Sequence, residues 1–184
     1  MKNVNIMGKI VMKVLEVGHW VAVGLMAVVG ICAAVAPQFL KFFMDVEGLL
    51  QDGELSVYGF EVMVLNSAGQ LHTGVLTLYA VGAVIIFAAM ALIFHNLYWM
   101  IKRSETASPF QNENIRSLKK IGILSFSVPL IGLLMSIVIR LAVGPDAVEL
   151  SMDQSGVIMG ILILCLTQFF IHGAQLEQDV EGLV

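Results

Sequence analysis

Residues 74–101 read GVLTLYAVGAVIIFAAMALIFHNLYWMI, a run that has no formal charge and one histidine, His95. A helix of about 20 apolar residues spans the hydrocarbon core of a bilayer, because each residue adds roughly 1.5 Å along the helix axis. The stretch is longer than this minimum. We therefore predict a transmembrane helix over about residues 74–101.

Three further stretches meet the same length requirement, over about residues 10–36, 121–143 and 156–176. Hydrophobic residues make up 58% of the chain and charged residues 13%, whereas soluble domains average about 45–50% and 25%. Charged side chains this few in number would not cover so much apolar surface in water. Lipid therefore has to cover it. The sequence predicts an all-α membrane protein, a four-transmembrane-helix bundle that forms a single membrane domain over residues 1–184.

The segment between the first two predicted spans, about residues 37–73, is the largest piece outside the membrane. Its apolar residues alternate with polar or aromatic neighbours from Leu55 to Gly59 and again from Val62 to Val64. Residues 66–69 read NSAG, a composition typical of turns. We expect a short β-hairpin in this small extracytoplasmic loop.

The basic residues near the span ends predict the orientation of the chain. Lys and Arg are enriched in loops on the cytoplasmic side of a membrane. The side that holds the N-terminus, the 102–120 loop and the 177–184 tail has eight of them, and the other side has two, Lys41 and Arg140. We therefore expect a multi-pass protein of a bacterial-type cytoplasmic (inner) membrane, with the N-terminus, the C-terminus and the 102–120 loop in the cytoplasm.

Polar side chains gather in the predicted spans at a similar depth below the cytoplasmic face. Helix rise places them roughly 5–13 Å inside the bilayer. Ionisable groups in a membrane are costly unless they are paired, so such a layer is a candidate ligand or switch site. Its members are Glu16, His19, His95, Gln168 and His172.

Several chemistries are open to this layer. Glu16, His19, His95 and His172 are of the types that bind divalent transition metals, and facing histidines can ligate haem iron. Histidine also titrates near neutral pH and can act as a proton switch. Because histidine, tryptophan and tyrosine favour the membrane interface, we expect a hydrogen-bonding role without a cofactor, and haem or a metal remains the alternative.

The 102–120 loop and the tail carry opposite charges. Pro109 is expected to end the second span, and Gln111 or Asn112 can cap an interfacial helix that leads into the third. The basic and acidic side chains can pair with each other or receive a cytoplasmic protein. These docking candidates are Arg116, Lys119 and Lys120 in the loop and Glu177, Asp179 and Glu181 in the tail.

Two segments resemble a known family. Residues 109–122 read PFQNENIRSLKKIG and residues 173–184 read GAQLEQDVEGLV. They resemble the F-x-x-E-N-x-x-x-L-R-R-I-G loop and the G-x-x-L-x-x-D ending of domain of unknown function 2975, whose members are small bacterial proteins with four predicted helices. Lys119 and Lys120 replace the usual arginine pair. The resemblance implies a membrane partner for a helix-turn-helix regulator, because relatives are often encoded beside one.

These observations favour a non-enzymatic sensory or regulatory membrane protein. A haem- or metal-binding redox protein and a small oligomeric transporter or channel subunit are the alternatives. A homo-oligomer also remains open. The serines lack the surroundings of a nucleophile elbow, and glycine-rich phosphate loops are absent from the sequence. Direct nucleic-acid binding is not expected, because the chain has no basic stripe and a formal charge of −4.

Overall fold

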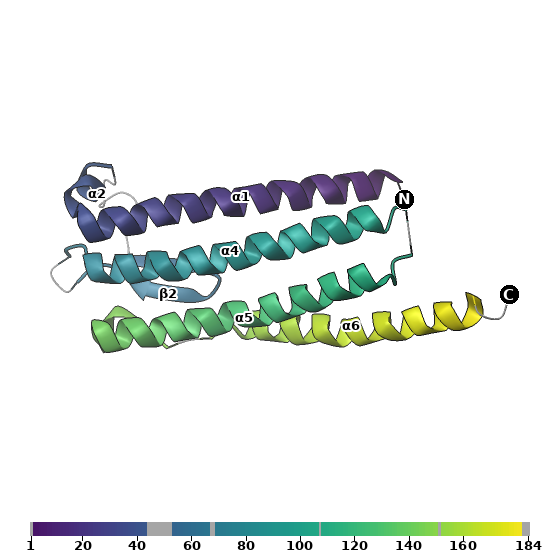
Figure 1. The fold of residues 1–184 in the computed structure, drawn as a ribbon. Coiled ribbons are helices and arrows are strands. Elements are labelled where there is room, and N and C mark those ends of the chain that lie inside the picture. The colour runs from purple at the N-terminus through teal and green to yellow at the C-terminus, as the bar shows by residue number, and fades with distance from the viewer. Residues whose placement is uncertain (1, 44–52, 67–68, 107, 151, 182–184) are drawn as a thin grey trace. The chain divides into compact units, whose positions relative to one another are not determined.

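The computed structural model describes residues 2–43, 53–66, 69–106, 108–150 and 152–181, and for residues 2–4, 41–43 and 181 it describes the backbone. Within these residues, four helices are long and apolar enough to cross a membrane (Figure 1). The predicted all-α membrane fold with a small β-hairpin is confirmed. The four helices are α1 (Lys2–Val35), α4 (Thr73–Arg103), α5 (Asn112–Ala142) and α6 (Gln154–Glu181).

The helices extend beyond most of the predicted spans. The largest difference is at the start of α5, where the expected interfacial helix and the third span form one continuous helix from Asn112. A span prediction counts only residues that fit the hydrocarbon core, whereas charged side chains continue a helix outside it without penalty. Pro129 also lies inside the same continuous helix. The expected outer loop contains a short helix, α2 (Pro37–Phe43), and the hairpin; its residues 44–52 and 67–68 lie outside the described ranges.

The chain divides into two compact units, and all four long helices contribute to the first. Unit 1 contains Met1–His19, Ala89–Ser127 and Ser155–Val184. Unit 2 contains Trp20–Ala88 and Val128–Gln154, and thus α2, the hairpin and the short 3-10 helix η1 (Pro145–Ala147). The predicted polar layer and the docking candidates all fall in unit 1.

The hairpin of unit 2 consists of β1 (Glu54–Val57) and β2 (Phe60–Met63), which pair antiparallel with Val57 opposite Phe60. The two residues between them, Tyr58 and Gly59, both have positive φ, at 49° and 78°. This is the conformation of a type I′ turn, whose twist matches that of paired strands. A tyrosine at positive φ is unusual. The sequence therefore predicts a turn over residues 66–69 but not the hairpin turn at Tyr58 and Gly59.

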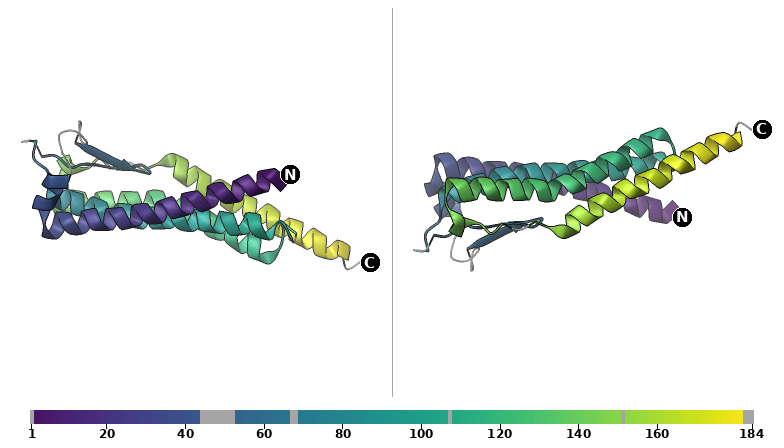
Figure 2. Two further views of the ribbon diagram at one scale, coloured as in Figure 1. Left: turned by 90° about the horizontal axis from the view of Figure 1, so that it is seen from above. Right: turned by 90° about the horizontal axis from the view of Figure 1, so that it is seen from below.

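Phe60 joins the hairpin to the helices of unit 2. Its side chain is 1% exposed and stacks on Tyr79 of α4, with ring centroids 5.2 Å apart. A methyl group at Gly82 of α4 would lie 2.7 Å from the Phe60 ring, and one at Gly132 of α5 would lie 3.3 Å from Phe60 Cβ. The two glycines therefore leave the space that Phe60 fills, and the hairpin lies flat against these helix segments (Figure 2).

Small residues also bring helix segments together inside each unit. In unit 1, a methyl group at Gly160 of α6 would lie 2.7 Å from the backbone nitrogen of Phe126 in α5. In unit 2, one at Gly30 of α1 would lie 2.9 Å from Ala80 Cβ. Close backbone approach of this kind is typical of membrane helices. Gly24 of α1 differs, because nothing lies within 4 Å of its Cβ position.

The helices differ in how much of their surface other parts of the chain cover. In the most apolar part of each span, 50% of the α4 residues are buried, against 6% for α1. An apolar helix surface that no protein covers is expected to face lipid. Of the four spans, α4 is thus the most buried and α1 the least.

Candidate functional site

Glu16 and His95 form a polar contact between α1 and α4 in unit 1. Glu16 is 6% exposed, and its Oε1 lies 3.0 Å from His95 Nδ1. Its second oxygen, Oε2, lies 3.1 Å from Nζ of Lys13, one turn earlier on α1. An ionised carboxylate only accepts hydrogen bonds, so His95 and Lys13 are the donors. The buried carboxylate is thus shared between a lysine on its own helix and a histidine of α4.

The Lys13–Glu16–His95 cluster ties α1 to α4, because Lys13 and Glu16 lie on α1 and His95 lies on α4. His95 keeps 45% of its side-chain surface uncovered by the rest of the described chain.

His19 lies on the same helix as Glu16. Its Nδ1 lies 2.7 Å from the backbone oxygen of Leu15, to which the ring donates a hydrogen bond. Its ring also packs against Phe94 of α4, with centroids 5.0 Å apart. His19 therefore contributes to the same α1–α4 contact as Glu16 and His95.

The other two candidates of the predicted polar layer lie on α6. His172 is exposed, and its Nδ1 lies 3.2 Å from Oε1 of Gln175 on the same helix. Gln168 is also exposed. Within the described ranges, no group of three or more His, Cys, Asp and Glu side chains is placed to hold a metal ion. The alternative metal site of Glu16, His19, His95 and His172 is thus not among the groups that the described part of the structure brings together.

Lysine and arginine side chains form cation–π contacts with aromatic rings next to the Lys13–Glu16–His95 cluster. Lys13 Nζ lies 5.5 Å from the centroid of the Tyr98 ring. Lys102 Nζ and the Arg103 guanidinium carbon lie 4.5 Å and 5.8 Å from the centroid of Trp99. Cations over aromatic faces are attracted by the ring quadrupole.

Lys9 provides a second tie between α1 and the rest of unit 1. Its Nζ lies 2.8 Å from the Glu105 carboxylate, in the loop that follows α4. Both side chains are about a quarter to a third exposed. The start of α1 is thus attached to α4 by Glu16–His95 and to the following loop by Lys9–Glu105.

The loop between α4 and α5 is fastened to the last turns of α6. Ser108 Oγ donates a hydrogen bond of 2.7 Å to Glu177 Oε2. Phe110 packs edge-on against Phe170, with centroids 5.3 Å apart, and a methyl group at Gly173 would lie 2.7 Å from the Phe110 ring. We call this set of contacts the loop–tail latch. Sequence reasoning had selected Glu177 and missed Ser108, because a serine in a loop carries no distinctive signal.

The predicted pairing between the basic loop and the acidic tail is not found in the described residues. The ion pairs of unit 1 include Lys9–Glu105, Lys13–Glu16 and His95–Glu16, and none of these joins the basic loop to the tail. Arg116, Lys119 and Lys120 are exposed, and so is Asp179. The side chain of Glu181 lies outside the described part. The expected charge pairing is thus replaced, at Glu177, by a hydrogen bond from an uncharged side chain.

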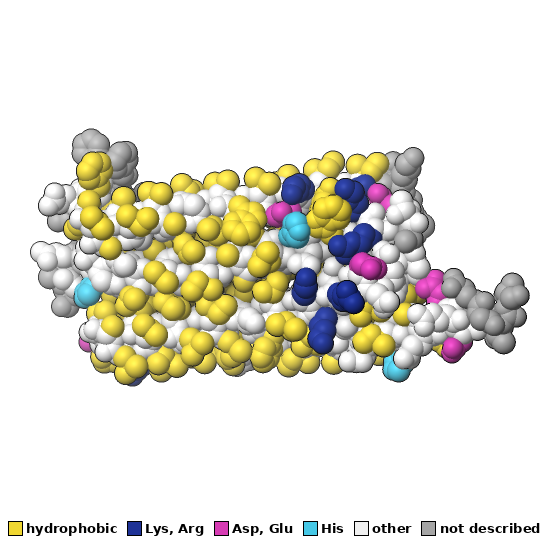
Figure 3. Space-filling model, in the orientation of Figure 1, with side chains coloured by type: hydrophobic (Ala, Val, Ile, Leu, Met, Phe, Trp, Pro, Cys, Tyr) yellow, Lys and Arg dark blue, Asp and Glu magenta, His cyan; other side chains and the backbone are white. Residues whose placement is uncertain are grey.

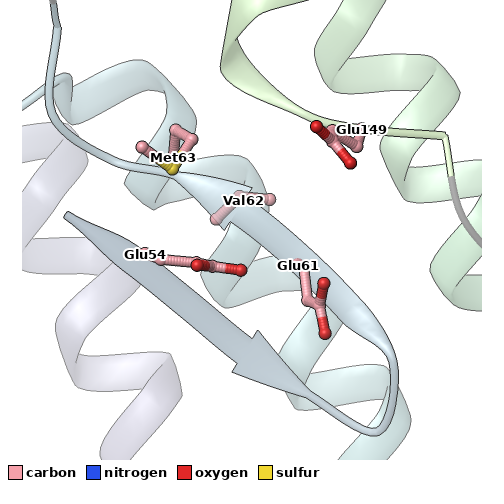
Figure 4. Close-up of a pocket in the computed structure, with 5 residues that line it drawn as sticks. All are labelled: Glu54, Glu61, Val62, Met63 and Glu149. Carbon is pink, nitrogen blue, oxygen red and sulfur yellow. The ribbon is translucent and has the colours of Figure 1, made fainter. Parts of the chain in front are cut away.

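In unit 2, the outer face of the hairpin is acidic. A shallow cavity of about 270 Å³ is lined by Glu54 and Glu61 of the hairpin and by Glu149, together with Val62 and Met63 (Figure 4). Burial raises the pKa of the Tyr58 phenol at the hairpin turn above its ordinary value. Three carboxylates without a described cation between them do not make a binding site, so we assign no ligand to this cavity.

Comparison with known proteins gives no further guide to the site: no family model, no curated protein and no solved structure matches the chain. The four candidate spans indicate an integral membrane protein, and any functional argument rests on the geometry of unit 1.

Proposed function

We propose that this chain is a non-enzymatic regulatory or sensory protein of a bacterial inner membrane, with unit 1 on the cytoplasmic side. In this proposal the C-terminal end of α6 is the output, and a small cytoplasmic regulator, such as the helix-turn-helix protein that the family resemblance implies, is the partner. The observation that carries the proposal is the loop–tail latch, because it links the end of α6 to a loop that contacts α1.

The last turns of α6 have the character of a docking helix. Leu176 and Val180 are 66% and 63% exposed, and residues four apart lie on the same helix face. Glu177 and Asp179 flank them and keep the segment soluble. An amphipathic helix with apolar residues at this spacing fits a hydrophobic groove on a partner protein.

The latch has the properties of a reversible attachment. One hydrogen bond between Ser108 and Glu177 contributes about 1.5–3 kcal/mol when the acceptor is charged, and part of that is lost to solvent at an exposed site. The Phe110 contacts add a small apolar area. Free energies of this size allow a signal to shift the tail between a held and a free state.

The input reaches the latch through α1. Lys9 on α1 is paired with Glu105, which lies three residues before Ser108 in the same loop. Displacement of α1 alters the position of this loop and thus the latch. Because α1 is otherwise little buried, it is the helix that a signal moves at the lowest energetic cost.

Site-specific photo-crosslinking in living cells tests the proposal. A photoactivatable residue at position 180 is expected to form an adduct with one soluble protein, and Ser108→Ala is expected to increase the yield. The same residue at position 134, on the exposed apolar surface of α5, is the matched control. Adducts at position 180 that contain only lipid, in both the parent chain and the Ser108→Ala variant, contradict the proposal.

A further inference from the structure

The first turns of α5 separate buried from charged residues by helix face. Asn114, Ser117, Leu118 and Ile121 are each at most 5% exposed. The opposite face presents three cations in a row at helical spacing, which we call the basic face: Arg116, Lys119 and Lys120. Because positions i, i+3 and i+4 lie together on a helix surface, the three charges occupy one patch.

Two acidic side chains of unit 1 are paired with cations outside this patch, and a third, Glu113, lies one turn before Arg116 on α5. Outside α6, the described acidic side chains of unit 1 are Glu16, Glu105 and Glu113. Glu16 is paired with Lys13 and His95, and Glu105 with Lys9. On α6, Glu177 accepts the hydrogen bond of Ser108. The ion pairs within the described residues do not include any member of the basic face, so its positive charge remains available to a ligand.

The end of α4 continues the same positive surface. Arg103 Nη1 donates to Ser117 Oγ over 3.1 Å, which brings the last turn of α4 against the first turns of α5. Lys102 and Arg103 lie over Trp99, which is 36% exposed. Tryptophan favours the headgroup level of a bilayer. Figure 3 shows the Lys and Arg side chains of this part of the molecule gathered on one face.

The position of the basic face on the helix identifies its ligand. Ile123 is 48% exposed and begins the apolar surface of α5, less than one turn after Lys120. The cations therefore lie near the start of the candidate span Asn112–Ala142, within one turn of its exposed apolar surface. Side chains at such a junction of charged and apolar helix surface are expected at the level of lipid headgroups, which favours an anionic lipid over a soluble acidic partner.

We propose that the basic face, together with Lys102 and Trp99, is a binding site for anionic phospholipid headgroups. The lipid phosphate accepts hydrogen bonds from Arg116, Lys119 and Lys120, which act as charge-assisted donors. Attraction to an anionic membrane surface strengthens binding roughly fivefold for each cation near it. The site does not depend on the regulatory function proposed above.

The test compares phosphatidylglycerol with phosphatidylcholine as ligands of the full-length protein. The protein is placed in nanodiscs that contain both lipids, and native mass spectrometry counts the lipids that stay bound after release. The Arg116→Gln, Lys119→Gln, Lys120→Gln triple variant is expected to lower the preference for phosphatidylglycerol about tenfold to a hundredfold. These side chains are exposed, so the helix is expected to fold in the variant.

Two matched controls separate charge from fold. The charge-conserving triple variant Arg116→Lys, Lys119→Arg, Lys120→Arg is expected to keep the preference, and so is Arg140→Gln, which removes an exposed cation from the other end of α5. An unchanged preference in the glutamine triple variant overturns the proposal. A photoactivatable residue at position 119 in cells gives the second readout: lipid adducts support the site, and adducts dominated by a protein replace it with an acidic cytoplasmic partner.

Discussion

His95 Nδ1 lies 3.0 Å from Glu16 Oε1, and this contact connects the least buried span, α1, to the most buried span, α4. Glu16 is the charged residue that unit 1 buries most deeply among its described side chains. Its two partners differ in kind, because Lys13 is a cation on the same helix and His95 comes from another. The contact between the two helices therefore depends on a hydrogen bond from His95 to a buried carboxylate.

Replacing His95 with alanine is expected to destabilise the protein by about 1–3 kcal/mol, because one oxygen of a buried carboxylate loses its donor. The measurement is the thermal unfolding of the detergent-purified protein. His172→Ala is the control, since His172 is exposed and bonds only to a neighbour on its own helix among the described contacts. Equal losses in the two variants would show that the Glu16–His95 contact contributes nothing specific.

A methyl group at Gly82 is expected to displace Phe60 and to destabilise the hairpin end of unit 2 by about 1–3 kcal/mol, the usual effect of overpacking. The check is a double-mutant cycle by thermal unfolding, in which Gly82→Ala is expected to cost less in the Phe60→Ala background. Gly24→Ala is the matched control, because nothing lies within 4 Å of that position. Additive effects of Gly82→Ala and Phe60→Ala would contradict the predicted contact.

Gly160 tests whether the small residues of α6 serve packing inside the chain. Gly160→Ala places a methyl group 2.7 Å from the backbone nitrogen of Phe126, where no flexible side chain can give way. We expect a loss of roughly 1–3 kcal/mol in thermal stability with no change in oligomeric state. Gly18→Ala, which meets nothing within 4 Å, is the control. A variant of normal stability but altered mass in solution would instead assign Gly160 to a contact between copies.

Removing the Ser108 hydroxyl is expected to free the end of α6. Hydrogen exchange of the amides between residues 173 and 181 should rise by about threefold to tenfold in Ser108→Ala, the range that corresponds to about 0.5–1.5 kcal/mol. Ser104→Ala is a comparison within the same loop, because Ser104 contacts Asn114 and not α6. Unchanged exchange in Ser108→Ala would remove the latch from the proposed mechanism.

The sequence alone determined that the chain has four membrane-spanning helices and a hairpin between the first two. Hydropathy and helix length are local properties, so the spans follow from residues 74–101 and their three counterparts without knowledge of any contact. Local patterns also selected Glu16, His95 and Glu177. They did so because ionisable groups in or beside apolar stretches stand out against their neighbours.

Only the tertiary structure decided which of these residues meet. The rotation of each helix about its axis, and which helices pack against each other, depend on contacts between residues far apart in the chain. The hydropathy of a segment does not determine either. Glu16 therefore pairs with His95 and not with a cluster of histidines, and Glu177 meets Ser108 instead of a cation. Phe60 likewise fits between α4 and α5 because Gly82 and Gly132 have no side chain where Phe60 packs. These three residues are far apart in the sequence, so only the folded structure shows that they meet.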